Sequence, residues 1–173
     1  YTATCGTQNA SGGGSPITVM GLANGVPVTC SVIATNAQGN STPSAASNSV
    51  TPASPPGAPT VGMAIPGNTE AFISFTAPAS NGGSPITGYT ATCNPGLVSG
   101  TDTVSPITVG GLTNTQLYSC SVTATNAIGP GAASATVDVT PLLNPPLTPV
   151  AVLSRKAHTG VVPFDLEIET GIA

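Results

Sequence analysis

The chain has 173 residues, of which only 5% are charged, and its formal net charge is −4. With two Lys/Arg residues it has no basic surface to neutralise nucleic-acid phosphates, so a nucleic-acid partner is not expected. No stretch approaches the roughly 18 consecutive apolar residues of a membrane span. A chain with 39% hydrophobic residues and so few charges is unlike a disordered chain, so its 21 Gly and 18 Pro are expected to mark turns between short strands.

The first elements of the chain return later in it. Tyr1–Cys5 recurs as Tyr89–Cys93, and Ser15–Val19 recurs as Ser105–Val109. A repeat of about 90 residues is a whole domain, because solenoid units are roughly 20–50 residues long. The sequence therefore predicts a tandem array of one β-rich module, which favours building, spacing or binding over catalysis.

The complete copy of the repeat shows the alternation of apolar and polar residues that is typical of half-buried strands. In its second strand, Ala71, Ile73 and Phe75 are expected to point inward. Turns are expected at residues 78–85 and 129–131. The predicted strands are residues 59–65, 70–75, 86–93, 101–112, 116–126 and 133–140. Short strands with turn signals every 8–12 residues or so predict an all-β fold, a β-sandwich.

The four cysteines form one pair in each repeat, Cys5 with Cys30 and Cys93 with Cys120. Both members of a pair lie on the apolar side of alternating segments. Opposed residues on antiparallel strands have Cα atoms about 4.5–5.5 Å apart, which is within disulfide range. We therefore expect one disulfide in each repeat, worth about 3.5 kcal/mol in the chain-entropy model. A metal site is the alternative, disfavoured because there is no CxxC motif and the single His lies elsewhere.

One motif of the complete copy consists of Leu112, Tyr118, Cys120, Val122, Ala124 and Asn126. This spacing resembles the signature of fibronectin type III domains, in which a Leu precedes a tyrosine corner and a strand that ends in Asn. The turn and strand start at residues 82–89 are also similar to that family. Phe75 stands where the family usually has a buried Trp, and Val28 replaces the corner Tyr in the first repeat. The resemblance implies tandem immunoglobulin-like β-sandwiches without catalytic residues or cofactors.

The resemblance covers residues 1–141 and divides the chain into three parts. Residues 1–52 are expected to form a fibronectin type III-like domain without its first two strands, and residues 53–141 a complete one. Residues 142–173 are expected to be a linker and the first strands of a further β-domain. Within them, residues 154–165 resemble the opening of a bacterial extracellular β-domain with the pattern SRKxHG, in which Thr159 replaces the usual Gly.

The two ends of the chain suggest a second arrangement. Strands from the tail of one subunit could complete the first domain of the next, which would give a head-to-tail filament. The preferred interpretation is that the chain is a window on a longer polypeptide, because domain arrays are normally covalent. The expected partners are therefore neighbouring domains or copies of the chain itself, and no ligand is identified.

Candidate binding residues gather near the end of the chain. His158, with Arg155 and Lys156, could bind an anion or an acidic polysaccharide, although a solvated turn is the favoured interpretation. Three carboxylates on one face of a predicted strand could contribute to a Ca²⁺ site, although a solvent-exposed strand face is favoured. These are Asp165, Glu167 and Glu169. No phosphate-binding loop or nucleophile elbow is present, so no catalytic residue or cofactor is predicted.

Together these features predict a structural module of a bacterial cell-surface or extracellular fibre. Disulfides indicate an oxidising compartment such as the periplasm, the cell surface or the medium. The alternative is an adhesive or carbohydrate-binding accessory region of a larger secreted enzyme. The chain has three Tyr and three Phe, most of them expected to be buried, which favours the structural role over sugar binding.

Overall fold

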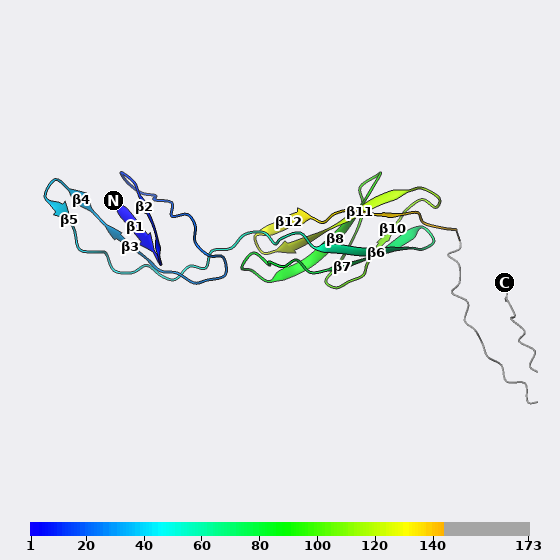
Figure 1. Ribbon diagram of the computed structural model, residues 1–173, viewed down its shortest axis with the longest axis horizontal. Helices are drawn as coiled ribbons and strands as arrows, with labels where there is room; N and C mark the ends of the chain where they lie inside the picture. Colours follow the sequence, from blue (N-terminus) through cyan, green and yellow to red (C-terminus); the bar gives the residue numbers. More distant parts are fainter. Residues whose placement is uncertain (144–173) are drawn as a thin grey trace, which may run out of the picture.

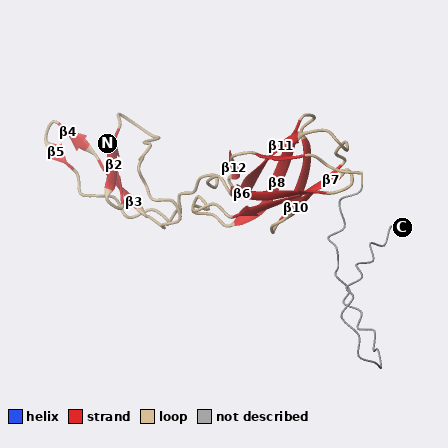
Figure 2. Ribbon diagram, turned by 45° about the vertical axis from the view of Figure 1, so that its right-hand side comes forward, coloured by secondary structure: helices blue, strands red, loops and turns tan. Residues whose placement is uncertain are grey.

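The computed structural model describes residues 1–143 of the chain. Figure 1 shows two modules that lie end to end, and Figure 2 shows that the regular structure in this part of the chain consists of strands. The first module contains β1 (Thr2–Cys5), β2 (Gln8–Ser11), β3 (Cys30–Ile33), β4 (Thr35–Asn36) and β5 (Gly39–Asn40). The second contains β6 (Thr60–Pro66), β7 (Glu70–Thr76), β8 (Ile86–Asn94), β9 (Val98–Asp102), β10 (Ile107–Gly110), β11 (Tyr118–Asn126), β12 (Gly129–Ala133) and β13 (Val137–Val139).

The second module is a sandwich of two antiparallel sheets. One sheet has the strand order β10-β7-β6, and the other has the order β12-β11-β8-β9, with β13 also paired to β11. Between them, Ile73 and Ile107 from the first sheet and Cys120 and Val122 from the second are fully buried in one hydrophobic core. The all-β, immunoglobulin-like sandwich that the sequence predicts is thus confirmed.

In β7 and β11, every second side chain points into this core. Ala71 and Ile73 are completely buried and Phe75 is nearly so, which confirms that these three residues point inward. In β11 every second residue from Tyr118 to Asn126 is buried, and the residues between them are partly exposed. A period of two places one face of each strand against the opposite sheet.

Two predicted segments of the second module are wrong in detail. The predicted strand over residues 101–112 is not continuous: its first two residues end β9, and only Ile107–Gly110 form β10, which belongs to the other sheet. The turn predicted at residues 129–131 lies within β12, because the hairpin turns earlier: the Asn126 side-chain oxygen accepts hydrogen bonds from Ile128 N and Gly129 N. Pro130 is compatible with β12 because this strand lies at the edge of its sheet, where an N–H group need not be paired.

The first module contains one three-stranded sheet in the order β2-β1-β3, which corresponds to the β9-β8-β11 part of the second module. The Ser-Pro-Ile-Thr-Val segment at residues 15–19 forms no strand, although the same residues at 105–109 include the start of β10. In the second module β10 pairs with β7, and residues 1–143 contain no counterpart of β7 for the first copy. The sequence of this segment is therefore not sufficient to make it a strand.

A serine ladder replaces the last strand of the first module. Ser41, Ser44 and Ser47 recur every three residues, and each binds β3 or the residue after it through two hydrogen bonds. In each case the serine N–H donates to a carbonyl oxygen, and the serine hydroxyl accepts from the N–H of that same residue: Ala34, Val32 or Cys30. Ser134 makes the same pair of bonds to Val122 in the second module. Serine side chains thus bond to the backbone groups at this sheet edge, where a paired strand would otherwise supply backbone hydrogen bonds.

Candidate functional site

Each module carries one disulfide between two adjacent strands of a sheet. Cys5 and Cys30 lie directly opposite each other on β1 and β3, with a Cα–Cα distance of 4.2 Å. Cys93 and Cys120 have the same relation on β8 and β11, at 4.0 Å. The predicted pairing is confirmed, and the described part of the chain contains no free cysteine. Each cross-link ties together two strands that are distant in sequence, because the half-cystines are separated by 25 or 27 positions in the chain.

The second module also has the corner that the sequence motif predicts. Tyr118 is buried, and its hydroxyl oxygen accepts a hydrogen bond of 3.0 Å from the backbone N–H of Thr113. The corresponding residue of the first module, Val28, has no hydroxyl group and instead pairs its backbone with Val50. Phe75 is buried in the core and packs against the partly buried Tyr89 with ring centroids 4.4 Å apart.

The junction between the modules is built from hydrogen bonds to the linker residue Ser54. Its N–H donates to Gly82 O at 2.8 Å, and its carbonyl oxygen accepts from the Asn126 side-chain amide at 2.8 Å. Its hydroxyl oxygen accepts from the Asn24 side-chain amide of the first module at 2.9 Å. Ser54 therefore connects both modules through all three of its polar groups.

Sequence reasoning missed this junction. Asn81–Gly83 was predicted only as a turn, and Asn126 only as the end of a strand. The signal that could have located it is the combination of two consecutive glycines with the linker Ser54–Gly57, because paired glycines allow close approach of another backbone.

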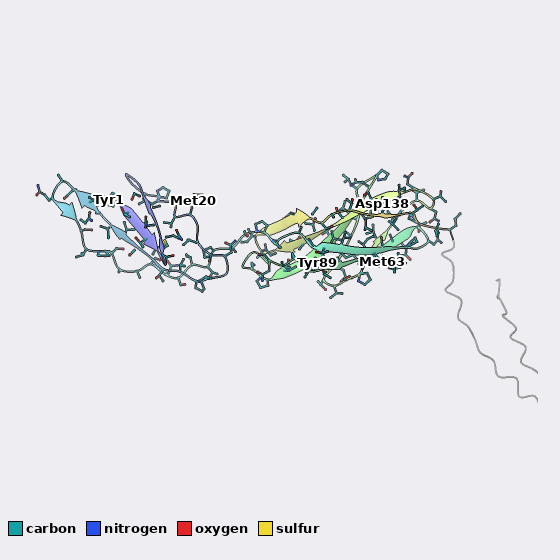
Figure 3. The ribbon with its side chains drawn as sticks, in the orientation of Figure 1. Tyr1, Met20, Met63, Tyr89 and Asp138 are labelled. Carbon is teal, nitrogen blue, oxygen red and sulfur yellow. A yellow bond between two sulfur atoms is a disulfide. The ribbon has the colours of Figure 1, made fainter. Side chains whose placement is uncertain are left out.

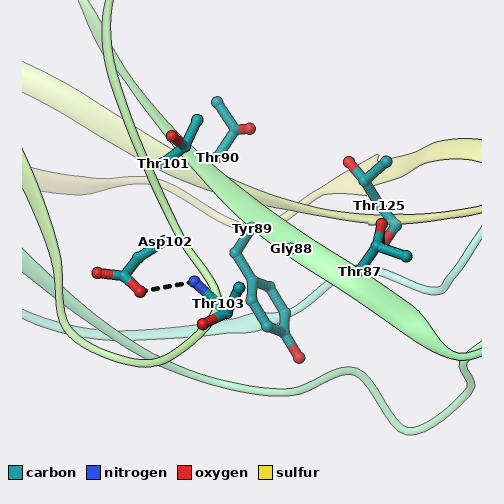
Figure 4. Close-up of a pocket in the computed structure, with 8 residues that line it drawn as sticks. All are labelled: Thr87, Gly88, Tyr89, Thr90, Thr101, Asp102, Thr103 and Thr125. Atoms are coloured by element: carbon teal, nitrogen blue, oxygen red, sulfur yellow. Dashed lines mark hydrogen bonds between the residues drawn. The ribbon is translucent and has the colours of Figure 1, made fainter.

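A shallow hollow of about 500 Å³ lies on the outside of the second module (Figure 4). Hydroxyl groups line most of it, and Tyr89 lies beside the carboxylate of Asp102. One Asp102 oxygen accepts hydrogen bonds from Thr103 N at 2.6 Å and Val104 N at 3.3 Å. This arrangement can hydrogen-bond a polar ligand, but it brings together no pair of acid and base groups.

A second hollow lies on the first module, between β1, β3 and the segment at residues 13–19. Its apolar lining includes Ala3, Ile17, Val19 and Val32. In the second module the corresponding face packs against β7 and β10. Figure 3 places Tyr1 and Met20 on this module, where both side chains are exposed.

Charged groups are sparse in the described part of the chain. No group of three His, Cys, Asp or Glu residues within residues 1–143 is arranged to hold a metal ion. The candidate Ca²⁺ carboxylates Asp165, Glu167 and Glu169, and His158 with Arg155 and Lys156, lie outside the described residues. Asp138 lies on β13 (Figure 3), which pairs with β11. Asp102 lies on β9, at the edge of the sheet beyond β8, so the two carboxylates are on different parts of the sheet. Within residues 1–143 no helix is long and apolar enough to cross a membrane.

Comparison with solved structures finds proteins of similar fold. Titin domains A168–A170 match with a TM-score of 0.50 and 20% identity, over 80% of this chain and 53% of that one. The twitchin kinase region from C. elegans matches with a TM-score of 0.47 and 21% identity, over 52% of this chain and 17% of that one. The chain thus spans about half or less of the length of these proteins. A search of curated proteins found no match.

The fold and the buried cross-link define an immunoglobulin-like β-sandwich module. The family model for the fibronectin type III domain matches residues 54–140, which is half of the chain. The chain belongs to the fibronectin type III family, whose domains are structural or interaction modules and are typically not catalytic.

Proposed function

We propose that this chain is a non-catalytic structural spacer within a bacterial cell-surface or extracellular fibre. The observation that carries the proposal is the repetition of one disulfide-linked module, with Cys5–Cys30 and Cys93–Cys120 in equivalent registers. A spacer needs modules that keep their length and shape, and the repeated cross-link provides this in each of them.

The position of the cross-link supports a load-bearing role. Cys93–Cys120 joins β8 to β11, the longest strand pair of the second module. When the ends of a module are pulled apart, the residues between the half-cystines cannot extend, so the length that the module gains on unfolding is limited. A disulfide also stabilises the module by restricting the unfolded chain.

The disulfides and the surface composition favour an extracellular location for the protein. Structural disulfides persist in oxidising compartments and are rare in the cytosol of mesophiles. Residues 1–154 contain no Lys or Arg, so this part of the chain offers no site to trypsin-like proteases. A nearly uncharged surface also reduces the like-charge repulsion between neighbouring modules, which suits close packing in a fibre.

Location is tested by immunogold electron microscopy of intact cells of the source organism, with antibodies raised against residues 1–143. The proposal predicts gold particles at the outer surface or along extracellular fibres. Labelling confined to the cytoplasm of sectioned cells would contradict it, as would native protein whose cysteines react with a thiol reagent before reduction.

We also propose that the apolar hollow of the first module is covered by two strands of the β6 and β7 type. The lining residues Ala3 and Val32 correspond to Ala91 and Val122, and Ile17 and Val19 correspond to Ile107 and Val109 of β10. In the second module these four residues are buried in one core with Ile73 of β7. The covering strands could come from the same polypeptide or from a second copy. Light scattering of the full chain over a range of concentrations distinguishes these sources: growth into long oligomers indicates strands supplied by other copies, whereas a constant monomer mass excludes them.

The alternative function is an adhesive or carbohydrate-binding accessory region of a secreted enzyme. The hydroxyl-lined hollow beside Tyr89 and Asp102 favours it, because sugars bind through hydrogen bonds and aromatic faces. Glycan-array binding by the full chain that is lost in Tyr89→Ala would support this function over the spacer.

A further inference from the structure

The end of the second module that faces the first is shaped by glycines. Its Gly82–Gly83 turn directly contacts the Asn24–Gly25 turn of the first module, and the linker residue Ser54 hydrogen-bonds to both turns. We propose that this junction is an interlocking surface that holds the two modules in one orientation and accepts only a preceding module with glycine at the position of Gly25. The proposal concerns the junction alone and holds whether or not the chain belongs to a surface fibre.

Backbone contact between the two turns is closer than side chains would allow. A Cβ atom on Gly83 would overlap Gly25 N and would lie 2.7 Å from the carbonyl carbon of Asn24. A Cβ atom on Gly25 would lie 3.1 Å from the Cα atom of Gly83. Both glycines also have positive φ angles, 82° and 78°, which residues with side chains rarely adopt. The fit therefore depends on glycine in both modules.

The linker is fixed to the second module by close packing as well as by hydrogen bonds. A Cβ atom on Gly82 would overlap Ser54 O, and one on Gly131 would overlap Pro56 O. Gly57 N donates to Ser80 O at 2.9 Å. The peptide groups from Ser54 to Gly57 thus have no room to swing, so the linker cannot act as a free hinge.

Asn126 reinforces the fixed linker from within the second module. Its side chain is buried, and its amide nitrogen donates to Ser54 O at 2.8 Å and to Asn81 O at 2.9 Å. Its side-chain oxygen accepts from the two backbone N–H groups that form the β11–β12 turn. One side chain therefore joins the linker, the glycine turn and the adjacent hairpin.

The far end of the second module shows why the junction is selective. Thr115 is the counterpart of Gly25, because Thr115 N donates to Pro141 O at 2.8 Å as Gly25 N donates to Pro52 O at 2.8 Å. It has a positive φ of 66°, so the module itself tolerates threonine in this turn. Its side chain, however, would occupy the space that a glycine turn needs in a junction of the first kind.

The residue that follows each module also differs between the two ends of the second module. Ser54 lies two residues after Pro52, and the residue two positions after Pro141 is Leu143, which has no hydroxyl group to accept a bond such as that from Asn24. Asn114, the counterpart of Asn24, is instead bonded within its own module to Thr69 N and to the side chain of Asn68. The two ends of the second module are therefore not interchangeable, and the glycine junction specifies which module precedes it.

Residual dipolar couplings of the full chain test the proposal directly. In the unaltered protein, couplings from the two modules must fit one alignment tensor, and the N–H of Ser54 must be protected from hydrogen exchange. Gly25→Thr and Gly83→Ala are each expected to give two different tensors. Gly25→Thr copies a residue that the second module already accepts, so it separates the junction from the folding of the turn.

Gly111→Ala is the matched control for Gly83→Ala. Gly111 has a φ of 80°, but a Cβ atom there would lie 4.0 Å from its nearest neighbour, a Val98 methyl carbon. The Gly111→Ala variant should therefore still give couplings that fit a single alignment tensor. Two tensors in the unaltered protein would overturn the fixed orientation. A single tensor in both Gly25→Thr and Gly83→Ala would overturn the selectivity for glycine.

Discussion

The two modules share short sequence segments, but the same segment can adopt different structures in the two modules. Ile107 and Val109 are completely buried in β10, whereas Ile17 and Val19, in the same Ser-Pro-Ile-Thr-Val segment, lie in an irregular loop and are partly exposed. The difference is the presence of β7, which supplies hydrogen-bond partners for one copy. A strand in a sandwich is thus determined by its partner as much as by its own residues, while the disulfides form in both copies because β1 and β3 repeat the pairing of β8 and β11.

The largest contrast is expected between the paired isoleucines. Ile107→Ala should lower the free energy of unfolding of the second module by about 2–5 kcal/mol, because it opens a cavity in a closed core. Ile17→Ala should cost less than about half as much, because the side chain is partly exposed before the change. Chemical denaturation followed by circular dichroism measures both, and equal losses would show that the first module has an equally closed core.

Removal of the cross-links should affect the two modules alike. The double variant Cys93→Ala, Cys120→Ala is expected to lose about 3.5 kcal/mol, because its loop of 27 residues is no longer closed in the unfolded state. The loop between Cys5 and Cys30 is nearly as long, so its removal should cost the first module a similar amount. Denaturation midpoints with and without reductant check this, and a loss below about 1 kcal/mol in either module would contradict it.

Asn126 and Asn36 occupy equivalent positions of the two modules, but their loss should change stability by different amounts. Asn126→Ala is expected to cost about 1–3 kcal/mol, because the peptide groups of Ser54 and Asn81 lose buried partners. Asn36→Ala should change stability by no more than about 0.5 kcal/mol, because Asn36 is exposed and accepts one bond, from Gln38 N. Thermal unfolding of both variants makes the comparison, and similar effects would mean that Asn126 does not hold the linker.

The smallest effect is expected at the tyrosine corner. Tyr118→Phe removes the hydroxyl that accepts from Thr113 N and should cost about 0.5–1.5 kcal/mol. Tyr89→Phe is the matched control, since Tyr89 lines the open hollow and its hydroxyl makes no hydrogen bond to the other residues drawn in Figure 4. Urea denaturation of the two variants side by side would contradict the role of the corner if both lost the same stability.

The sequence predicted most of what depends on apolar alternation. Inward positions of β7, the sandwich and both disulfides follow from residues that repeat with period two and from the matched cysteine pairs. The serine ladder at Ser41, Ser44 and Ser47 could not be predicted this way, because its period of three comes from side chains that bond to the backbone of a strand. Strand β9 was missed because Val98–Asp102 has a glycine and hydroxyl residues in place of an apolar stripe.

The junction illustrates a different limit of sequence reasoning. Gly82–Gly83 was visible as a turn, but the close backbone of Gly25 that faces it comes from another module, 58 residues earlier for the Gly25–Gly83 pair. Glycine in a sequence indicates that the backbone needs room or a positive φ, but it does not say which segment approaches. Only the arrangement of the two modules identifies the partner.

Single-molecule force extension of the full chain, held at its two ends, tests the spacer account most directly. With the disulfides intact, the step that unfolds the second module must exclude the segment between Cys93 and Cys120. Reduction should therefore lengthen this step by about 90 Å, from 27 residues at about 3.3–3.6 Å each. A step of unchanged length after reduction would contradict the account, because the cross-link would then not limit the extension of the module under load.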